Sequence, residues 1–216
     1  MGLADWTFTG SATASLESVS PAAPVGSKWL HLAVPSGVGF PLVAQAAPKD
    51  PPYPHGSTEG RLRSILRYHS NVLNCRFGFA CMQSQANLVS GGQAYAAVLT
   101  RGVPSHYIDL IKITAGIASS TLIARSPLDL WSWGTTLTLE FAWKLDLANE
   151  GGIILHVRLG TATDYSDLAE VDNLTEVVVS TAVLTTTVGE SLIVRNEDGG
   201  GTGHFYADQT SFTNDV

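Results

Sequence analysis

Apolar and polar residues alternate along much of this chain with the two-residue period that is typical of β-strands. The clearest alternation runs through residues 135–143 and 152–159; in the first, Leu137, Leu139 and Phe141 are separated by threonine or glutamate. Because successive side chains of a strand point to opposite faces of a sheet, each segment predicts a strand with one buried and one exposed face. No run of helical period is long enough to predict a helix.

Shorter apolar runs, separated by glycine, proline, serine and asparagine, predict further strands along the chain. We expect them at residues 28–34, 61–68, 74–83, 94–101, 107–114, 120–125, 176–180, 183–187, 191–195 and 204–212. About a dozen strands at this spacing favour an all-β fold, an antiparallel jelly-roll β-sandwich. A chain of 216 residues suits one large β domain, so we expect residues 1–216 to form a single β-sandwich domain.

Residues 41–60 interrupt this rhythm with a concentration of prolines. Proline cannot donate a backbone hydrogen bond, so we expect an extended loop or arm here and not a central strand. A tyrosine among the prolines is an aromatic group of the kind that fills a partner's pocket. We predict a docking arm that gains order from a neighbouring subunit; the alternative is a mobile loop. The residues of the arm are Pro48, Pro51, Pro52, Tyr53 and Pro54.

Composition indicates an ordered protein with an apolar surface. Only 14% of residues are charged, 44% are hydrophobic and the mean hydropathy is +0.14. Apolar surface on a small chain is usually buried against neighbours, so we expect the working state to be an assembly that includes copies of this chain. The net charge of -7 disfavours a nucleic-acid partner. The first residues lack the pattern of a secretion signal and no apolar stretch of about 18 residues occurs, so we expect no membrane partner.

The charges are unevenly distributed along the chain. Residues 1–108 carry seven Lys and Arg against four Asp and Glu, whereas residues 109–216 carry five against fifteen. This asymmetry predicts one basic and one acidic end, and head-to-tail contacts between copies. Three arginines on one predicted strand share a face and a fourth follows on the next strand, which favours either a basic face for an acidic partner or an ordinary solvated face. These residues are Arg61, Arg63, Arg67 and Arg76.

The two cysteines, Cys75 and Cys81, are expected to be reduced and buried. They share one face of a predicted strand, where six residues at about 3.3 Å rise separate them by about 20 Å. A disulfide needs Cα atoms within about 7 Å, so the two cannot pair within that strand.

The order of these segments resembles the concanavalin A-like (laminin G-like) jelly-roll family. The similar pieces are the opening at residues 6–34, the meander at 94–99, 107–114 and 120–125, the turn and long strand at 133–141, and the glycine-rich closing strand at 199–208. The resemblance implies two curved antiparallel sheets. It leaves function open, since this fold occurs in lectins, glycosidases and virion proteins.

Glycosidases of this fold place two carboxylates on one strand in the pattern E-x-D-x-E or E-x-D-x-x-E. The nearest match, Glu170, Asp172 and Glu176, has its last acid one residue too late, and no other catalytic motif occurs, so we expect no enzyme and no catalytic residue. The acidic segment offers oxygen ligands for a structural calcium ion, and the resemblance adds one aspartate of the last strand; the alternative is a solvated acidic loop without a cofactor. The calcium candidates are Asp164, Asp167, Asp172 and Asp208.

Together these features favour a structural virion protein of a bacteriophage, a capsid decoration, collar or tail-associated subunit. It would be assembled in the host cytoplasm, and its partners would be other virion proteins. The alternative is a lectin-like or receptor-binding module with a surface glycan as partner, and a glycoside hydrolase comes third. For the alternative, Trp131 and Trp133 flank a turn and can stack on sugars, whereas Trp143 is in phase with a core face.

Overall fold

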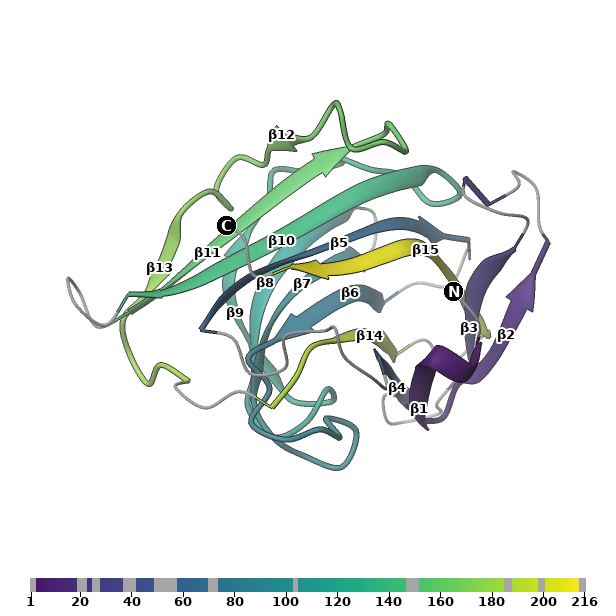
Figure 1. Cartoon of the computed structure of the whole chain (residues 1–216), viewed down its shortest axis with the longest axis horizontal. Helices are drawn as coiled ribbons and strands as arrows, with labels where there is room; N and C mark the ends of the chain where they lie inside the picture. Colours follow the sequence, from purple (N-terminus) through teal and green to yellow (C-terminus); the bar gives the residue numbers. More distant parts are fainter. Residues whose placement is uncertain are drawn as a thin grey trace.

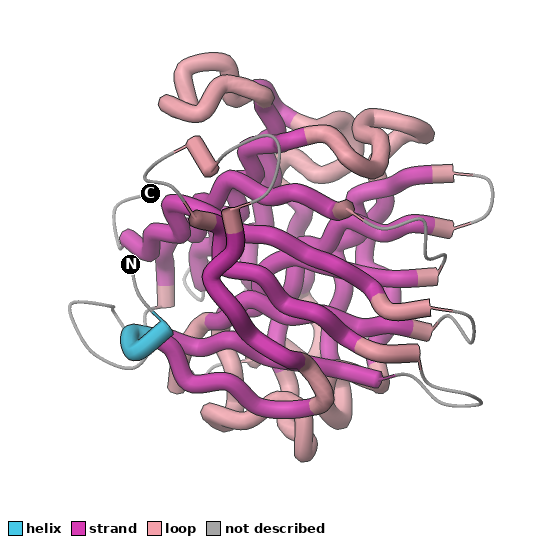
Figure 2. Tube along the Cα trace, turned by 90° about the vertical axis from the view of Figure 1, so that its right-hand side faces the viewer, coloured by secondary structure: helices cyan, strands magenta, loops and turns pink. Residues whose placement is uncertain are grey.

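The computed structural model describes residues 3–18, 23–24, 28–36, 42–48, 58–69, 74–102, 105–146, 152–184, 188–197 and 201–213. In these ranges the protein is an all-β sandwich of two antiparallel sheets, in which strands make up most of the trace (Figure 2). β10, β5 and β15 of one sheet lie in front of β6, β7 and β8 of the other (Figure 1). The jelly-roll prediction is therefore confirmed. No helix in the described ranges is long and apolar enough to cross a membrane.

Each sheet brings together strands that are distant in sequence. The seven-stranded sheet has the order β1 (Trp6–Gly10), β4 (Leu42–Pro48), β14 (Ser191–Asn196), β6 (Cys75–Cys81), β7 (Ala94–Arg101), β8 (His106–Ile113) and β9 (Ser120–Arg125). The eight-stranded sheet has the order β12 (Ala169–Glu170), β11 (Gly152–Gly160), β10 (Thr136–Asp146), β5 (Glu59–Tyr68), β15 (Gly203–Thr213), β3 (Trp29–Val34) and β2 (Thr13–Glu17), and β13 (Val177–Val179) also pairs with β11. A short 3-10 helix, η1 (Leu3–Asp5), precedes β1.

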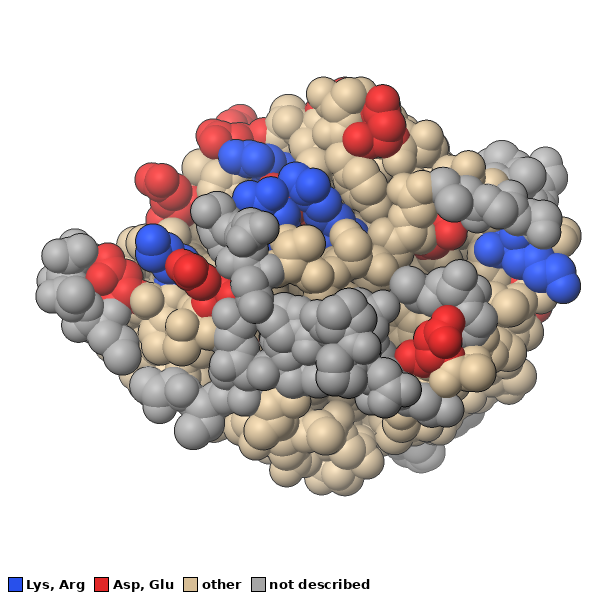
Figure 3. All heavy atoms as spheres, in the orientation of Figure 1, with Lys and Arg blue, Asp and Glu red and all other residues tan. Residues whose placement is uncertain are grey.

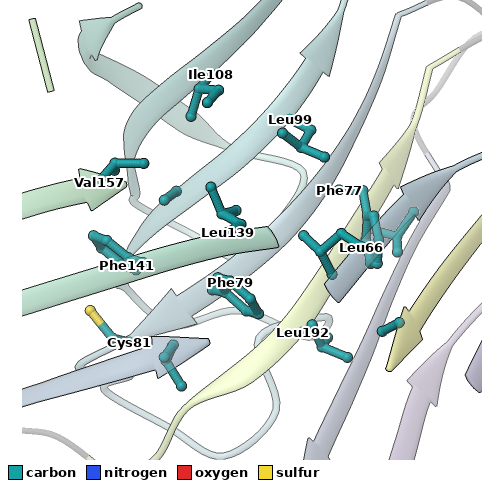
Figure 4. Packing of buried hydrophobic residues seen from close by; sticks show 14 of the residues in the cluster. Leu66, Phe77, Phe79, Cys81, Leu99, Ile108, Leu139, Phe141, Val157 and Leu192 are labelled. Atoms are coloured by element: carbon teal, nitrogen blue, oxygen red, sulfur yellow. The ribbon is translucent and has the colours of Figure 1, made fainter. Parts of the chain in front are cut away.

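The main core fills the space between the two sheets. Alternate residues of each strand point inward, so Phe77 and Phe79 of β6 meet Leu66 of β5 and Phe141 of β10, all fully buried (Figure 4). Burial of aromatic and aliphatic side chains of this size is the main stabilising contribution.

A second apolar cluster covers the outer face of the seven-stranded sheet. Val98 of β7 and Ile193 of β14 point to this face and pack with Leu88 and Ile117 from the loops at residues 82–93 and 114–119. Buried on both faces, β7 consists almost wholly of apolar residues and shows little alternation. The two loops join each other through the Ile117 N–H, which donates to the Leu88 carbonyl at 3.0 Å.

Most predicted strands are present within a few residues of the expected bounds. Strands β1, β2, β4 and β12 were not predicted. Residues 183–184 are not in a strand, contrary to the prediction for 183–187, and the rest of that segment lies outside the described residues.

The prediction for the proline-rich segment is wrong over its first part. β4 lies between β1 and β14 and is hydrogen-bonded to both, so it is an internal strand and not a docking arm. A proline is tolerated here because Pro48 is the last residue of the strand, opposite Trp6, where no further hydrogen bond of the ladder depends on its missing N–H. Pro51, Pro52, Tyr53 and Pro54 lie outside the described residues, and their role as an arm stays a prediction.

The predicted separation into a basic and an acidic end is also wrong. β5, from the basic half of the sequence, lies between β10 and β15 from the acidic half, and β14 lies between β4 and β6. Antiparallel pairing therefore places strands from the basic half and the acidic half of the sequence next to each other. The distribution of charge on the surface depends on this pairing and not on the order of residues along the chain.

Candidate functional site

Two arginines of the predicted basic face converge on one buried carboxylate. Arg63 Nε lies 2.5 Å and Arg61 Nε 3.5 Å from Glu140 Oε2, and Arg158 Nη1 lies 3.4 Å from Glu140 Oε1. Lys and Arg side chains gather over the strands of the eight-stranded sheet, with acidic side chains beside them (Figure 3). Glu140 therefore neutralises part of this basic face from within.

The other two arginines of the prediction lie elsewhere. Arg67 is buried on β5 and donates from Nε to the Gly134 carbonyl at 3.2 Å, and desolvation lowers the pKa of its guanidinium. Arg76 lies on β6 in the other sheet, so the prediction that all four share one sheet face is wrong. β5 and β6 follow each other in the sequence but belong to different sheets. The alternation of side chains along β5 therefore does not predict which face the residues of β6 occupy.

The predicted calcium ligands do not form one site. Asp167 accepts hydrogen bonds from the Thr161 and Ala162 N–H groups, and Asp164 accepts from Ser166, so both carboxylates close their own turns. These bonds hold the pKa of each carboxyl below its ordinary value.

Asp172 follows the edge strand β12, and Asp208 lies on β15, where its carboxylate accepts from the Gln209 N–H. In the described ranges no group of three or more His, Cys, Asp or Glu side chains is placed to hold a metal ion. The four predicted calcium ligands therefore do not form one calcium site in the described part of the chain.

One tryptophan of the predicted sugar platform is accessible. Trp131 and Trp143 are buried, but the side chain of Trp133 is 48% exposed in the turn between β9 and β10. Arg101, at the end of β7, lies over the Trp133 ring at 5.4 Å from the centroid.

Residues of the turn that carries Trp133 line a cavity of about 500 Å³, which we call the apolar cavity. Its wall includes Trp131, whose indole N–H donates to the Tyr107 carbonyl at 2.8 Å, and His106, whose ring meets Trp131 edge-on. Asp129 fixes the first residue of β8 by accepting from the His106 N–H at 3.0 Å. His106 Nε2 is buried and has no hydrogen-bond partner among the described residues. The remaining lining residues are Leu130, Ser132, Thr135, Thr136, Leu137 and Thr161.

A second, more polar pocket of about 300 Å³ lies at the same end of β7 and β8, and we call it the arginine pocket. It is lined by Asn74, Arg76, Thr100, Arg101, Gly102, Tyr107, Arg125 and Glu197. The two pockets are neighbours, because Arg101 and His106 are cross-strand partners and Trp131 is bonded to Tyr107.

Three histidines that show no pattern in the sequence meet on the outer face of the eight-stranded sheet. His31 Nδ1 lies 2.6 Å from Glu17 Oε1, His31 Nε2 lies 3.0 Å from His204 Nδ1, and His69 stands edge-on to Tyr206. Desolvation lowers the pKa of His31, although Glu17 opposes this shift. No sequence signal could have found this cluster, because the register of β3 with β15 creates it.

Comparison with known proteins adds information on the fold. No protein-family model and no curated protein sequence matches this chain. Among solved structures, the Ca²⁺/Man3GlcNAc-bound VIP36 exoplasmic/lumenal domain is 12% identical with a TM-score of 0.58. The alignment covers 98% of this chain and 84% of the VIP36 chain. The cellulose-induced protein Cip1 is 12% identical with a TM-score of 0.53, covering 100% and 94%. A legume lectin-like domain from Entamoeba histolytica is 9% identical with a TM-score of 0.53, covering 99% and 92%. The chain therefore has the concanavalin A-like, legume-lectin-like β-sandwich fold that its segment order predicted.

Proposed function

We propose that this protein is a carbohydrate-binding module whose site is the apolar cavity together with Trp133. The observation that carries the proposal is an exposed indole, Trp133, in the same turn that lines a cavity with an aromatic wall; a further lining residue, His106, has a buried Nε2 without a hydrogen-bond partner among the described residues. The apolar faces of sugar rings pack on aromatic side chains, and a few polar groups then fix the orientation of the hydroxyls. The cavity has the size of a small-ligand site.

The structural neighbours support this proposal over a purely structural role. The VIP36 domain is described with bound Man3GlcNAc, and the Emp46p neighbour, with a TM-score of 0.55 and 10% identity, is a carbohydrate recognition domain. Ca²⁺ and potassium accompany those two proteins. Repeating the binding measurement with Ca²⁺ and with a chelator tests whether a metal contributes to binding by this chain.

A glycan array with the purified protein tests the proposal. We expect selective binding to a subset of glycans, lost in Trp133→Ala and weakened at least about tenfold in His106→Ala. Val178→Ala is the matched control, since Val178 is also 48% exposed but lies on β13. The proposal is wrong if the array shows no selective binding, or if Trp133→Ala binds as well as the control.

A structural role in a larger assembly is the second candidate, and one observation favours it. Leu122, Leu128 and Leu130, on the edge strand β9 and the loop after it, have side chains that are 54%, 59% and 41% exposed. Exposed apolar groups next to an unpaired strand edge favour a protein partner. For this role, the sequence features favour a bacteriophage virion assembled in the host cytoplasm as the setting. A monodisperse monomer in sedimentation at high concentration, together with absence from particles, would count against this role.

A further inference from the structure

The arginine pocket places like charges next to one another across the seven-stranded sheet. Arg195 of β14 is the direct cross-strand partner of Arg76 on β6, and Arg76 is the partner of Thr100 on β7. Like charges directly opposite each other destabilise a sheet. Glu197 lies at the pocket and is paired with Arg195, so it offsets only part of this charge.

Two further arginines of the pocket are held in position by aromatic rings. Arg125 binds the buried carboxylate of Asp109 through Nε at 2.7 Å and Nη2 at 3.0 Å, and its guanidinium carbon lies 4.3 Å from the centroid of the Tyr107 ring. This pair leaves Nη1 of Arg125 outside the bidentate contact. Arg101 is held over Trp133. A positioned guanidinium binds carboxylates at lower entropic cost than a mobile one, because its planar fork is already oriented.

The pocket also contains a hydroxyl residue. Thr100 is one of the lining residues, and its Oγ1 is buried and has no hydrogen-bond partner among the described residues. Buried hydroxyls are normally hydrogen-bonded, so an unpartnered one beside three arginines indicates a place for an oxygen of a ligand or a bound water.

We propose that the arginine pocket binds the carboxylate of an acidic sugar, within a glycan whose neutral part lies against Trp133 and the apolar cavity. This inference rests on the proposed carbohydrate-binding function. Arg101 contacts Trp133 and lines the arginine pocket, so Trp133 and this pocket are neighbours at the end of β7. A carboxylate suits the site better than a polyanion, because Glu197 lines the same pocket and the chain has a net charge of -7.

The test compares matched pairs of glycans that differ only in a carboxylate, glucuronate against glucose and galacturonate against galactose. We expect the wild-type protein to bind the acidic member at least about tenfold more tightly, with a preference that falls as salt rises. Arg76→Gln and Thr100→Val are expected to reduce this preference several-fold while binding to the neutral member stays unchanged. Lys144→Gln is the control, because it removes one exposed cation from the other sheet. Thermal unfolding of each variant confirms that it is folded.

The outcomes separate the two proposals. Equal binding of acidic and neutral members, or an acid preference that both pocket variants retain, overturns the acidic sugar and leaves the carbohydrate-binding function standing. An array without any bound glycan overturns the proposed function and the acidic sugar together.

Discussion

Gln45 is expected to hold the loop at residues 82–93 against the seven-stranded sheet, and replacing it tests how β4 supports the fold. Its side-chain amide is buried on β4. Nε2 donates to the Ala86 carbonyl at 2.9 Å and to Gln83 Oε1 at 3.1 Å, while Oε1 accepts from the Leu88 N–H at 2.8 Å. Two backbone groups of the loop therefore depend on this one side chain.

The substitution Gln45→Met keeps most of the volume and removes the hydrogen bonds. Leaving a buried donor or acceptor without a partner costs about 1–3 kcal/mol. The Leu88 N–H is left without its acceptor inside the fold, whereas water can reach the partly exposed Ala86 carbonyl, so the free energy of unfolding should fall by about 2 kcal/mol. The loop should also open locally, because Leu88 packs in the second apolar cluster.

Urea unfolding measures the change in stability, and hydrogen exchange at the Leu88 amide reports the local opening. Gln85→Met is the matched control in the same loop: Gln85 Nε2 donates to the Asn87 carbonyl at 2.7 Å, but it is only partly buried, so water can replace that bond and the loss should stay below about 1 kcal/mol. A loss below about 1 kcal/mol for Gln45→Met, with the Leu88 amide still protected, would refute the argument.

Three other predictions concern the core. Gly78→Ala should lower the free energy of unfolding in urea by about 3 kcal/mol or more, because a Cβ there would lie 2.1 Å from a backbone oxygen of β7. Gly102→Ala is the control and should change stability by less than about 0.5 kcal/mol, because the nearest atom to its Cβ would be 3.8 Å away. Equal effects of the two substitutions would contradict this prediction. Burial raises the pKa of Glu190 to about 8 from 4.5, so the folded state retains a proton that the unfolded chain releases, and stability should fall as the pH rises between these values. Glu190→Gln should flatten the dependence of Tm on pH over that range, and an unchanged slope would be evidence against it. The buried thiols of Cys75 and Cys81 should react with a thiol reagent only on unfolding, because burial raises the pKa of the Cys81 thiol; fast labelling of both in the native protein would show that they are accessible.

The strands with strong local patterns could be predicted from the sequence. The bounds of β7 and β9 match the predicted 94–101 and 120–125. β4 could not be predicted, because its neighbouring prolines favour a loop and its buried Gln45 resembles a surface residue until its partners in the 82–93 loop and on β14 are known. Local propensity is outweighed there by the tertiary environment.

The candidate site shows the same division. Composition and spacing identified Trp133 and Arg76, but nothing in the sequence pattern placed the two residues together. Their proximity to Arg101 and Arg125 depends on the register of β6, β7 and β8 and on the turn after β9. Charge asymmetry along the chain was misleading, since the sandwich interleaves its two halves.

By itself, the sequence determined the all-β class, the order of most strands and the two-faced pattern of each. These properties follow from steric preferences and alternation over a few residues, and both are local. Tertiary structure alone decided which strands are neighbours, which arginines are neutralised by Glu140 or Asp109, and which buried polar atoms have no hydrogen-bond partner among the described residues. Those outcomes depend on pairing between residues far apart in the chain, where burial and electrostatics act through distances that the linear sequence does not contain.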